Sequence, residues 1–343
     1  MRRSRISVLV AVACLGWSQP VAAATSPALP IVFATLDGKL VRVNPDGSGR
    51  AVIAADPKRY WQYRAPDVSP DGRRVAFAYC DPGIGHPDPP CLLGIVNING
   101  TDLRVLEDVK GVSTPRWSPD GRRIAYGTLH DVMVVNCDGS GGSRVASGHG
   151  PEWLADGVTL VFWEYKEVDN PDRNDSGGEI LGAALYTVRA DGSEAPRQLG
   201  PDFKEDVGQL TVSPDGRRLA FLVEAHSPNE SSTIALMNVD GSDIRPFRQR
   251  SDGSYRLGRP AWSPDGRQIA HAEADSEGHW TTIVIDDLAT ARTTIVEKGP
   301  GLWTAWANPG TPDESGGLTD PWNLGSCRST SAGPGPWSGM AGR

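Results

Sequence analysis

Ten residues decide the fold of this chain: Trp117-Ser118-Pro119-Asp120-Gly121-Arg122-Arg123-Ile124-Ala125-Tyr126. The pattern returns four more times, once in a degraded form, at Val68–Phe77, Trp153–Phe162, Val212–Phe221 and Trp262–His271. The turn aspartates of the five copies lie about 48 residues apart on average. A repeat of this length is typical of architectures in which each unit packs against its sequence neighbours.

The residue types of the motif predict a tight turn between two strands. Proline presets the backbone angle of the second turn position, aspartate accepts local amide hydrogen bonds, and glycine adopts the left-handed conformation. Apolar residues stand before and after the turn, as they do in buried strands. Each copy is therefore predicted to be a β-hairpin.

A second turn follows in most units, about twenty to thirty residues later. It has the form Asn-x-Asp-Gly-Ser or a close variant, and its copies start at Asn44, Asn97, Asn136, Arg189 and Asn238. An apolar strand precedes each of these turns and another short strand follows it, so each unit holds four strands. Four-stranded units repeated around an axis are the blades of a β-propeller. We predict an all-β, six-bladed β-propeller over residues 31–306.

The first blade needs a strand from the other end of the chain. Ile31–Ile53 supplies three strands and lacks an inner one, whereas Leu302–Trp306 resembles the inner strands of the other blades. We expect this C-terminal strand to complete the first blade, because such closure removes the open sheet edges.

The pair of motifs resembles the repeat of the TolB-type β-propellers of bacterial envelope proteins, and the resemblance covers Ile31–Trp306. It implies the propeller fold and a place in the bacterial envelope. The family's periplasmic protein carries an α/β domain ahead of its propeller, for which residues 24–30 offer no counterpart, so a Tol-Pal partnership is not expected. Function has to be argued from the site, because a fold hosts many functions.

The N-terminal residues predict export. Arg2, Arg3 and Arg5 precede the uncharged run Ile6–Gly16, and small residues follow at Val21–Ala24. This order is that of a signal peptide, here residues 1–24, which places the mature protein in the periplasm or outside the cell. A lipidated Cys14 and a twin-arginine signal remain as alternatives. Residues 309–343 are rich in Gly, Pro and Ser and are predicted to be a disordered tail.

The net charge disfavours some classes of partner, and the cysteines predict a disulfide. The net charge of −8 repels nucleic-acid phosphates and anionic lipid, and no later stretch is apolar enough to span a bilayer. We expect a monomer without a cofactor or metal. In an oxidising compartment, Cys80 and Cys91, which bracket a loop rich in Pro and Gly, are predicted to form a disulfide. The pairing of Cys137 and Cys327 stays open.

Propeller topology separates two faces of the ring. Both tight turns of a blade emerge on one face, and the longer connections emerge on the other, which we call the long-loop face. Loops on a rigid scaffold are the usual place of binding sites. Residues entering the inner strands are expected to line the channel there, beside a stacking surface of three aromatic residues. The candidates are Tyr60, Trp61, Tyr63, Arg64, Thr114, His149, Gln209, Arg259 and Trp303.

The sequence favours a non-catalytic scaffold that binds an envelope protein or peptide. It has no nucleophile elbow, Walker loop or H-E-x-x-H motif. The alternative is a metal-assisted carbohydrate lyase or hydrolase that uses histidines of the long-loop face, namely His86, His130, His149, His226 and His279. A calcium loop at Asp172, Asn174 and Ser176 is disfavoured, because Ala183 stands where the bidentate glutamate belongs.

Overall fold

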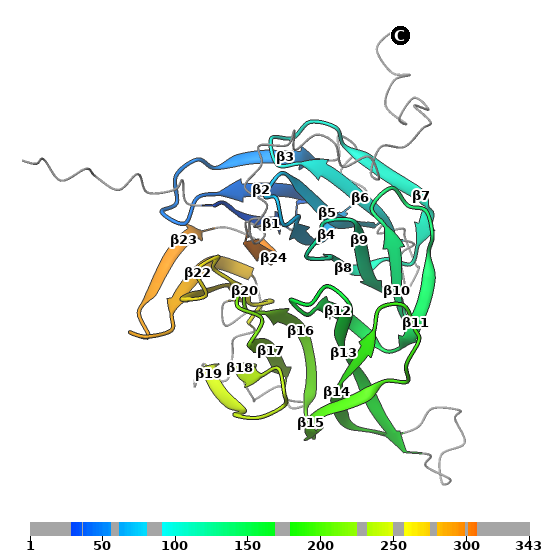
Figure 1. The fold of residues 1–343 in the computed structure, drawn as a ribbon. Coiled ribbons are helices and arrows are strands. Elements are labelled where there is room, and N and C mark those ends of the chain that lie inside the picture. The colour runs from blue at the N-terminus through cyan, green and yellow to red at the C-terminus, as the bar shows by residue number, and fades with distance from the viewer. Residues whose placement is uncertain are drawn as a thin grey trace, which may run out of the picture.

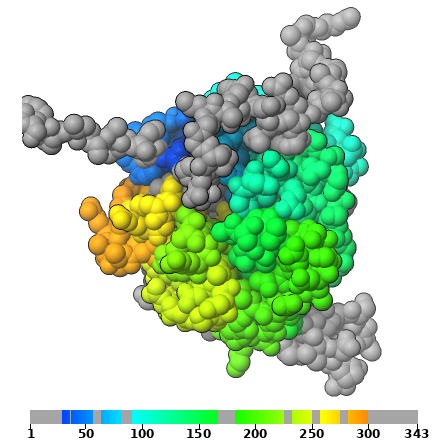
Figure 2. Space-filling view, viewed as in Figure 1, coloured from blue at the N-terminus to red at the C-terminus, as the bar shows by residue number. Residues whose placement is uncertain are grey.

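The computed structural model describes residues 29–35, 37–55, 62–80, 91–168, 179–224, 232–249, 257–274, 280–298 and 301–306. These residues contain 24 β-strands in six four-stranded sheets. The sheets surround a common centre as blades (Figure 1). In the space-filling view the blades follow one another around the ring in chain order (Figure 2). The predicted all-β, six-bladed propeller is confirmed.

Each blade is antiparallel and is numbered here along the chain, with its strands given from the inner to the outer one. Blade 1 holds β24 (Gly301–Trp306), β1 (Ile31–Thr35), β2 (Lys39–Val43) and β3 (Ala51–Ala55). Blade 2 holds β4 (Gln62–Val68), β5 (Arg74–Cys80), β6 (Cys91–Asn97) and β7 (Arg104–Lys110). Blade 3 holds β8 (Ser113–Trp117), β9 (Arg123–Gly127), β10 (Asp131–Asn136) and β11 (Ser143–Ser147).

The other three blades repeat this order. Blade 4 holds β12 (His149–Trp153), β13 (Thr159–Val168), β14 (Glu179–Arg189) and β15 (Arg197–Phe203). Blade 5 holds β16 (Asp206–Val212), β17 (Arg218–Glu224), β18 (Thr233–Asn238) and β19 (Arg245–Gln249). Blade 6 holds β20 (Ala261–Trp262), β21 (Gln268–Ala274), β22 (Trp280–Asp287) and β23 (Thr293–Lys298).

The hairpin motif works as its residue types predict. In blade 3, Ser118 Oγ donates to Asp120 Oδ1 over 2.5 Å, and Asp120 Oδ1 also accepts from the Arg122 amide over 3.0 Å. The Gly121 amide donates to the Ser118 carbonyl over 2.8 Å with a φ of 66°. This left-handed φ suits glycine, which has no Cβ. The side chains of serine and aspartate therefore stabilise the turn through contacts within the blade itself.

The ring closes as predicted. β24 pairs with β1 in antiparallel register, with Ile31 opposite Trp306 and Phe33 opposite Thr304. β24 thus provides the inner strand of blade 1, and β1 is hydrogen-bonded on both of its sides.

The hydrophobic core lies between the blades. Each of the six buried clusters unites residues of two neighbouring blades, and the inner-strand tryptophans Trp117, Trp153 and Trp262 belong to three of them. Trp153 packs against Ala125 and Val132 of blade 3. These tryptophans therefore pack between neighbouring blades.

The second arginine of the motif packs against the following blade in three places. Arg74, Arg123 and Arg218 lie over the rings of Trp117, Trp153 and Trp262 of the following blade, at 4.6, 4.7 and 4.9 Å from the ring centroids. A guanidinium over an indole face is attracted by the ring quadrupole. The motif therefore joins neighbouring blades as well as forming a turn.

Replacing Arg123 tests this junction. Arg123 also donates through Nη2 to the Gly157 carbonyl of blade 4 over 2.8 Å. We expect Arg123→Ala to lower the free energy of unfolding by about 1–2 kcal/mol, because a stacked cation and a hydrogen bond are lost. Arg122→Ala is the matched control, since Arg122 is exposed. Equal midpoints of the two variants in urea unfolding would contradict this role of Arg123.

The predicted disulfide is present. Cys80 and Cys91 face each other across the β5–β6 pair and are bonded. Cys137, which is buried, is disulfide-bonded as well.

We expect the double substitution Cys80→Ala/Cys91→Ala to lower the free energy of unfolding by about 2–3 kcal/mol, because the loop closure no longer restricts the unfolded chain. Urea unfolding of the two proteins under oxidising conditions measures the difference. Equal urea midpoints for the wild type and the double variant would refute the expectation.

Several predictions fall outside the described residues. They are the signal peptide at residues 1–24, the tail at 309–343, the disfavoured calcium loop at 172–176, and the candidates Tyr60 and Trp61. In the part of the chain that the structure describes, no helix has the length and apolar character needed to cross a membrane.

Candidate functional site

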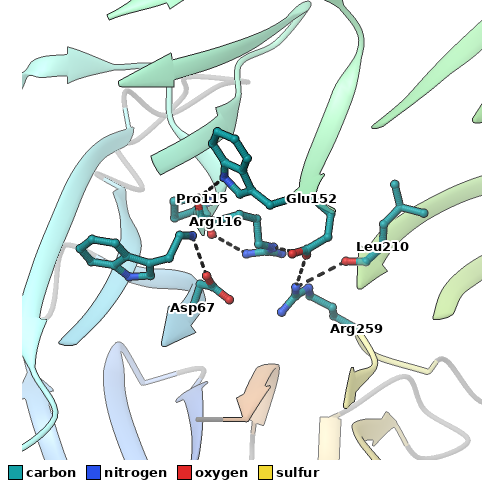
Figure 3. A network of polar contacts seen from close by, with 8 residues as sticks. Asp67, Pro115, Arg116, Glu152, Leu210 and Arg259 are labelled. Carbon is teal, nitrogen blue, oxygen red and sulfur yellow. Dashed lines mark hydrogen bonds and ion pairs between the residues drawn. The ribbon is translucent and has the colours of Figure 1, made fainter. Parts of the chain in front are cut away.

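An arginine–glutamate–arginine bridge crosses the centre of the ring (Figure 3). The Glu152 Oε2 atom accepts from Arg259 Nη2 over 2.9 Å and from Arg116 Nε over 3.1 Å. The side chains of Arg116 and Arg259 are only 2% and 3% exposed, and that of Glu152 is 14% exposed. Glu152 stands on β12 of blade 4, Arg116 on β8 of blade 3, and Arg259 just before β20 of blade 6.

Further polar contacts extend this bridge to neighbouring inner strands. Asp67 of blade 2 accepts from the Trp117 amide over 2.8 Å, and Arg259 donates to the Leu210 carbonyl of blade 5 over 3.4 Å. Trp153 Nε1 donates to the Arg116 carbonyl over 3.1 Å. The connected set, which we call the central network, therefore touches five successive blades, 2 to 6.

The charged side chains of the central network are buried. Burial lowers the pKa of Arg116 to about 10, with the nearby Arg259 adding to the decrease. Arg116 therefore stays charged at neutral pH. Burial raises the pKa of the Glu152 carboxyl, while Arg259 and Arg116 oppose that rise. The network joins the inner strands of the blades through paired side chains at the centre of the ring.

A backbone irregularity recurs on the inner strands, on the long-loop side of this network. The strand register shifts in blades 2, 3, 4 and 5, and a positive φ stands at the shift in Ala65, Thr114, Gly150 and Gln209. Thr114 Oγ1 and Gln209 Oε1 are buried without a hydrogen-bond partner among the described residues. Unusual backbone angles and unsatisfied polar atoms often mark sites that bind something.

Three rings gather between blades 4 and 5, at the end of the ring that carries the longer connections. His149 begins β12 and stands directly opposite Trp163 of β13, and their ring centroids are 4.6 Å apart. Tyr165 lies 4.9 Å from Trp163 and 5.6 Å from His149. All three side chains are half-buried. We call them the mouth cluster, because β12 starts and β13 runs toward the long-loop face.

The charge state of the mouth cluster follows from its surroundings. Burial lowers the pKa of His149, and the nearby His130 lowers it further, so His149 is neutral at neutral pH. Burial raises the pKa of the Tyr165 phenol, and the negative charges of Asp206 and Glu224 raise it more. The rings thus form an uncharged surface beside two carboxylates.

The structure places the residues predicted from the sequence in different environments. His149 belongs to the mouth cluster, Arg259 to the central network, and Thr114 and Gln209 to the bulged positions. Arg64 is half-buried on β4. Tyr63 is buried against Phe77 and Tyr79 in the core, so its ring offers no stacking surface. Trp303 lies on β24.

The expected cluster of histidines is described only in part. His130 is exposed in the connection between β9 and β10, on the same face as His149. His86, His226 and His279 lie outside the described residues. Within the described ranges, no group of three His, Cys, Asp or Glu side chains has a geometry that would hold a metal ion.

A second buried polar group lies between blades 5 and 6. His271 Nε2 and Asp286 Oδ2 are 2.9 Å apart, and Arg248 Nη2 donates to Glu273 Oε1 over 3.1 Å. His271 is fully buried at the place where other blades carry an aromatic core residue such as Phe221. A substrate has no access to its ring, so this group serves the packing of the two blades.

Comparisons with known proteins agree on the fold. No protein-family model matches the chain. It is 23% identical over 260 residues to dipeptidyl-peptidase 5 of Porphyromonas endodontalis, covering 63% of this chain and 38% of that protein. It is 34% identical over 83 residues to the Tol-Pal system protein TolB of Coxiella burnetii, covering 24% of this chain and 18% of that protein.

The chain therefore spans well under two thirds of the length of these curated relatives. Among solved structures, TolB from Acinetobacter baumannii superposes with a TM-score of 0.61 at 16% identity, covering 82% of this chain and 67% of that one. Likeness at this identity establishes architecture and leaves function to the site. Together with the repeat motifs and the six closed blades, it establishes that this chain carries a six-bladed β-propeller similar to that of TolB.

Proposed function

We propose that this propeller is an exported, non-catalytic scaffold that binds a protein segment or peptide of the bacterial envelope at the mouth of its channel. The mouth cluster carries the proposal, because aromatic rings that are partly exposed on a rigid scaffold are typical anchors of protein interfaces. His149, Trp163 and Tyr165 are half-buried at the end of the ring that carries the longer connections.

The central network supports binding at the mouth rather than passage through the ring. Arg116, Glu152 and Arg259 meet across the centre, so a chain entering from the long-loop face reaches paired and buried charges. Displacing such a pair leaves a buried charge uncompensated, which is costly. A ligand is therefore held above the network, at the level of the bulged residues and the mouth cluster.

The relatives favour a ligand made of amino acids. One belongs by name to the Tol-Pal system, and another is by name a dipeptidyl-peptidase. Export is supported by the predicted signal peptide and by the Cys80–Cys91 disulfide, a bond that persists in oxidising compartments.

Affinity capture from envelope extracts tests the proposal. The immobilised protein is compared with Trp163→Leu, which removes the indole but keeps apolar volume, and with Val158→Ala as the control. Val158 is exposed in the turn between β12 and β13, on the opposite face. We expect the wild type and Val158→Ala to retain the same protein and Trp163→Leu to lose it. Retention by all three, or by none, would refute binding at the mouth.

The metal-assisted enzyme remains the alternative from the sequence, and three of its five histidines lie outside the described residues. Metal analysis of the purified protein decides this point. Stoichiometric manganese, zinc or iron would favour the enzyme over the scaffold.

A further inference from the structure

We propose that Asn99 is a site of spontaneous deamidation and that Thr101 promotes the reaction. Asn99 is exposed in the second turn of blade 2, on the tight-turn face, so this inference is independent of binding at the mouth. Gly100 follows it in the only Asn-Gly pair of the chain. The amide nitrogen after an asparagine can attack the side-chain amide carbon, and a glycine there places no Cβ atom in the way.

The other copies of the turn show what this position needs. They hold aspartate here, and one aspartate oxygen, Oδ1, accepts from the amide of the serine two residues later over 2.9 to 3.0 Å and from its hydroxyl over 2.6 Å. These aspartates are Asp46, Asp138, Asp191 and Asp240. Asn99 Oδ1 accepts the same two bonds from Thr101, over 3.1 and 2.7 Å. Asn99 Nδ2 makes no hydrogen bond among the described residues, so its loss costs the turn no contact.

The reaction needs only water as a second reactant. The Gly100 nitrogen bonds to Asn99 Cγ, and the side-chain NH2 group leaves as ammonia with the hydrogen of the Gly100 amide. Water then opens the resulting succinimide ring. Addition at Cγ gives aspartate, the residue of the other copies, and addition at the main-chain carbonyl gives isoaspartate, which lengthens the backbone. Both residues are exposed, so water reaches the ring.

Thr101 acts on the atom where charge develops. As the Gly100 nitrogen attacks, negative charge builds up on Asn99 Oδ1, and donors that already point at such an oxygen stabilise the transition state. Thr101 provides two of them, its amide and its hydroxyl. A side-chain carbonyl bonded to the amide two residues on also lies folded over the peptide unit between them, which is the unit that carries the attacking nitrogen.

Packing between blades keeps glycine at position 100. Its φ is 86°, and a Cβ atom there would lie 3.0 Å from the Ile53 carbonyl oxygen of blade 1. In the closed turn the Gly100 amide donates to the Asn97 carbonyl over 2.8 Å. The attack therefore takes place when this bond opens, and exposed backbone hydrogen bonds open most readily. The fold thus retains the residue that leaves Asn99 unshielded.

Peptide mapping of the full chain by mass spectrometry tests the site. The folded protein is stored at mildly alkaline pH, and the mass gain that replaces NH2 with OH is followed at each asparagine, with an unstored sample as the starting level. We expect Asn99 to convert, and Asn97 and Asn238, which branched residues follow, to stay unconverted over the same time. No conversion at Asn99, or equal conversion at Asn238, would overturn the proposal.

Two variants test the role of Thr101. Thr101→Val removes the hydroxyl donor and keeps the amide, and we expect it to lower the rate of conversion at Asn99 about fivefold. Thr101→Ser gives the turn the residue of the other copies and should convert at the wild-type rate. Both positions are exposed, so urea midpoints should stay close to the wild type and show that the variants fold. Conversion in Thr101→Val as fast as in the wild type, or faster, would overturn this role.

Asn99→Asp represents the aspartate product. We expect it to melt at no lower a temperature than freshly purified wild type at neutral pH, because aspartate accepts the same two bonds from Thr101. A lower melting temperature would contradict the claim that the turn loses no contact on conversion.

Discussion

Glu152→Ala is expected to lower the free energy of unfolding by about 3–5 kcal/mol, which is the cost of leaving buried charges without their partner. Arg116 and Arg259 are both almost fully buried, and both donate to the one oxygen that this substitution removes. Total stabilities of domains are about 5–15 kcal/mol, so the variant should unfold at a much lower urea concentration or temperature.

Two companion variants separate charge from shape. Glu152→Gln keeps an acceptor oxygen and should lose less stability than Glu152→Ala. Glu164→Ala removes the same residue type from the neighbouring strand β13, at a half-exposed position, and should be close to the wild type. If Glu152→Ala and Glu164→Ala unfold at the same urea concentration, the central network does not stabilise the ring.

Removal of β24 is the other change with a large expected effect. A chain that ends at Pro300 lacks the inner strand of blade 1, and β1 then exposes the edge that pairs with residues 301–306. Ile31 and Phe33 of β1 are core residues, and loss of packing at large core side chains costs about 3–5 kcal/mol. We expect this chain to be largely unfolded or aggregated.

A chain that ends at Trp306 is the matched control, because it differs only by the six residues of β24. It should show one cooperative thermal transition. If the chain ending at Pro300 melts cooperatively at the same temperature as this control, closure of the ring by β24 is not needed for the fold.

The fold could be predicted from the sequence, because the residues that form each turn lie close together in the chain and recur from blade to blade. Ser118, Asp120 and Gly121 form their turn through contacts within six residues, and the same residue types recur in four blades. The tryptophans before the turns of blades 3, 4 and 6 identify the packing between blades. The missing strand of blade 1 followed from counting, since five complete units left three strands at the start of the chain and one strand at its end.

The contacts at the centre of the ring were harder to predict from the sequence, because they join residues far apart in the chain. Arg259 and Glu152 are 107 residues apart, and no spacing in a repeat predicts such a pair. The positions three or four residues before the last residue of each inner strand hold Thr114 and Gln209 at the bulges and, in blade 6, Arg259 of the central network. The other charged side chains of the network, Asp67, Arg116 and Glu152, stand directly before the Val68, Trp117 and Trp153 positions.

Trp163 of the mouth cluster could have been singled out in the sequence by comparing the copies of the hairpin motif. The residue after the aromatic position of the motif is Ala78, Gly127, Leu222 or Ala272 in the other blades, and Trp163 in blade 4. A large ring at a position that holds a small or aliphatic residue in the other blades indicates a role that is particular to blade 4. Tyr63 shows the opposite error, because an aromatic residue near a loop was expected to be exposed and is packed in the core.

Photo-crosslinking in living cells that export the protein tests most directly the claim that the long-loop face binds a partner. A photoreactive amino acid replaces Leu129, which is 56% exposed beside His130 on that face, or Val158, which is 41% exposed on the tight-turn face. Neither position belongs to the core, so both proteins should fold. We predict a discrete crosslinked protein from position 129 and none from position 158. The same crosslink from both positions, or one from position 158 alone, would contradict the account.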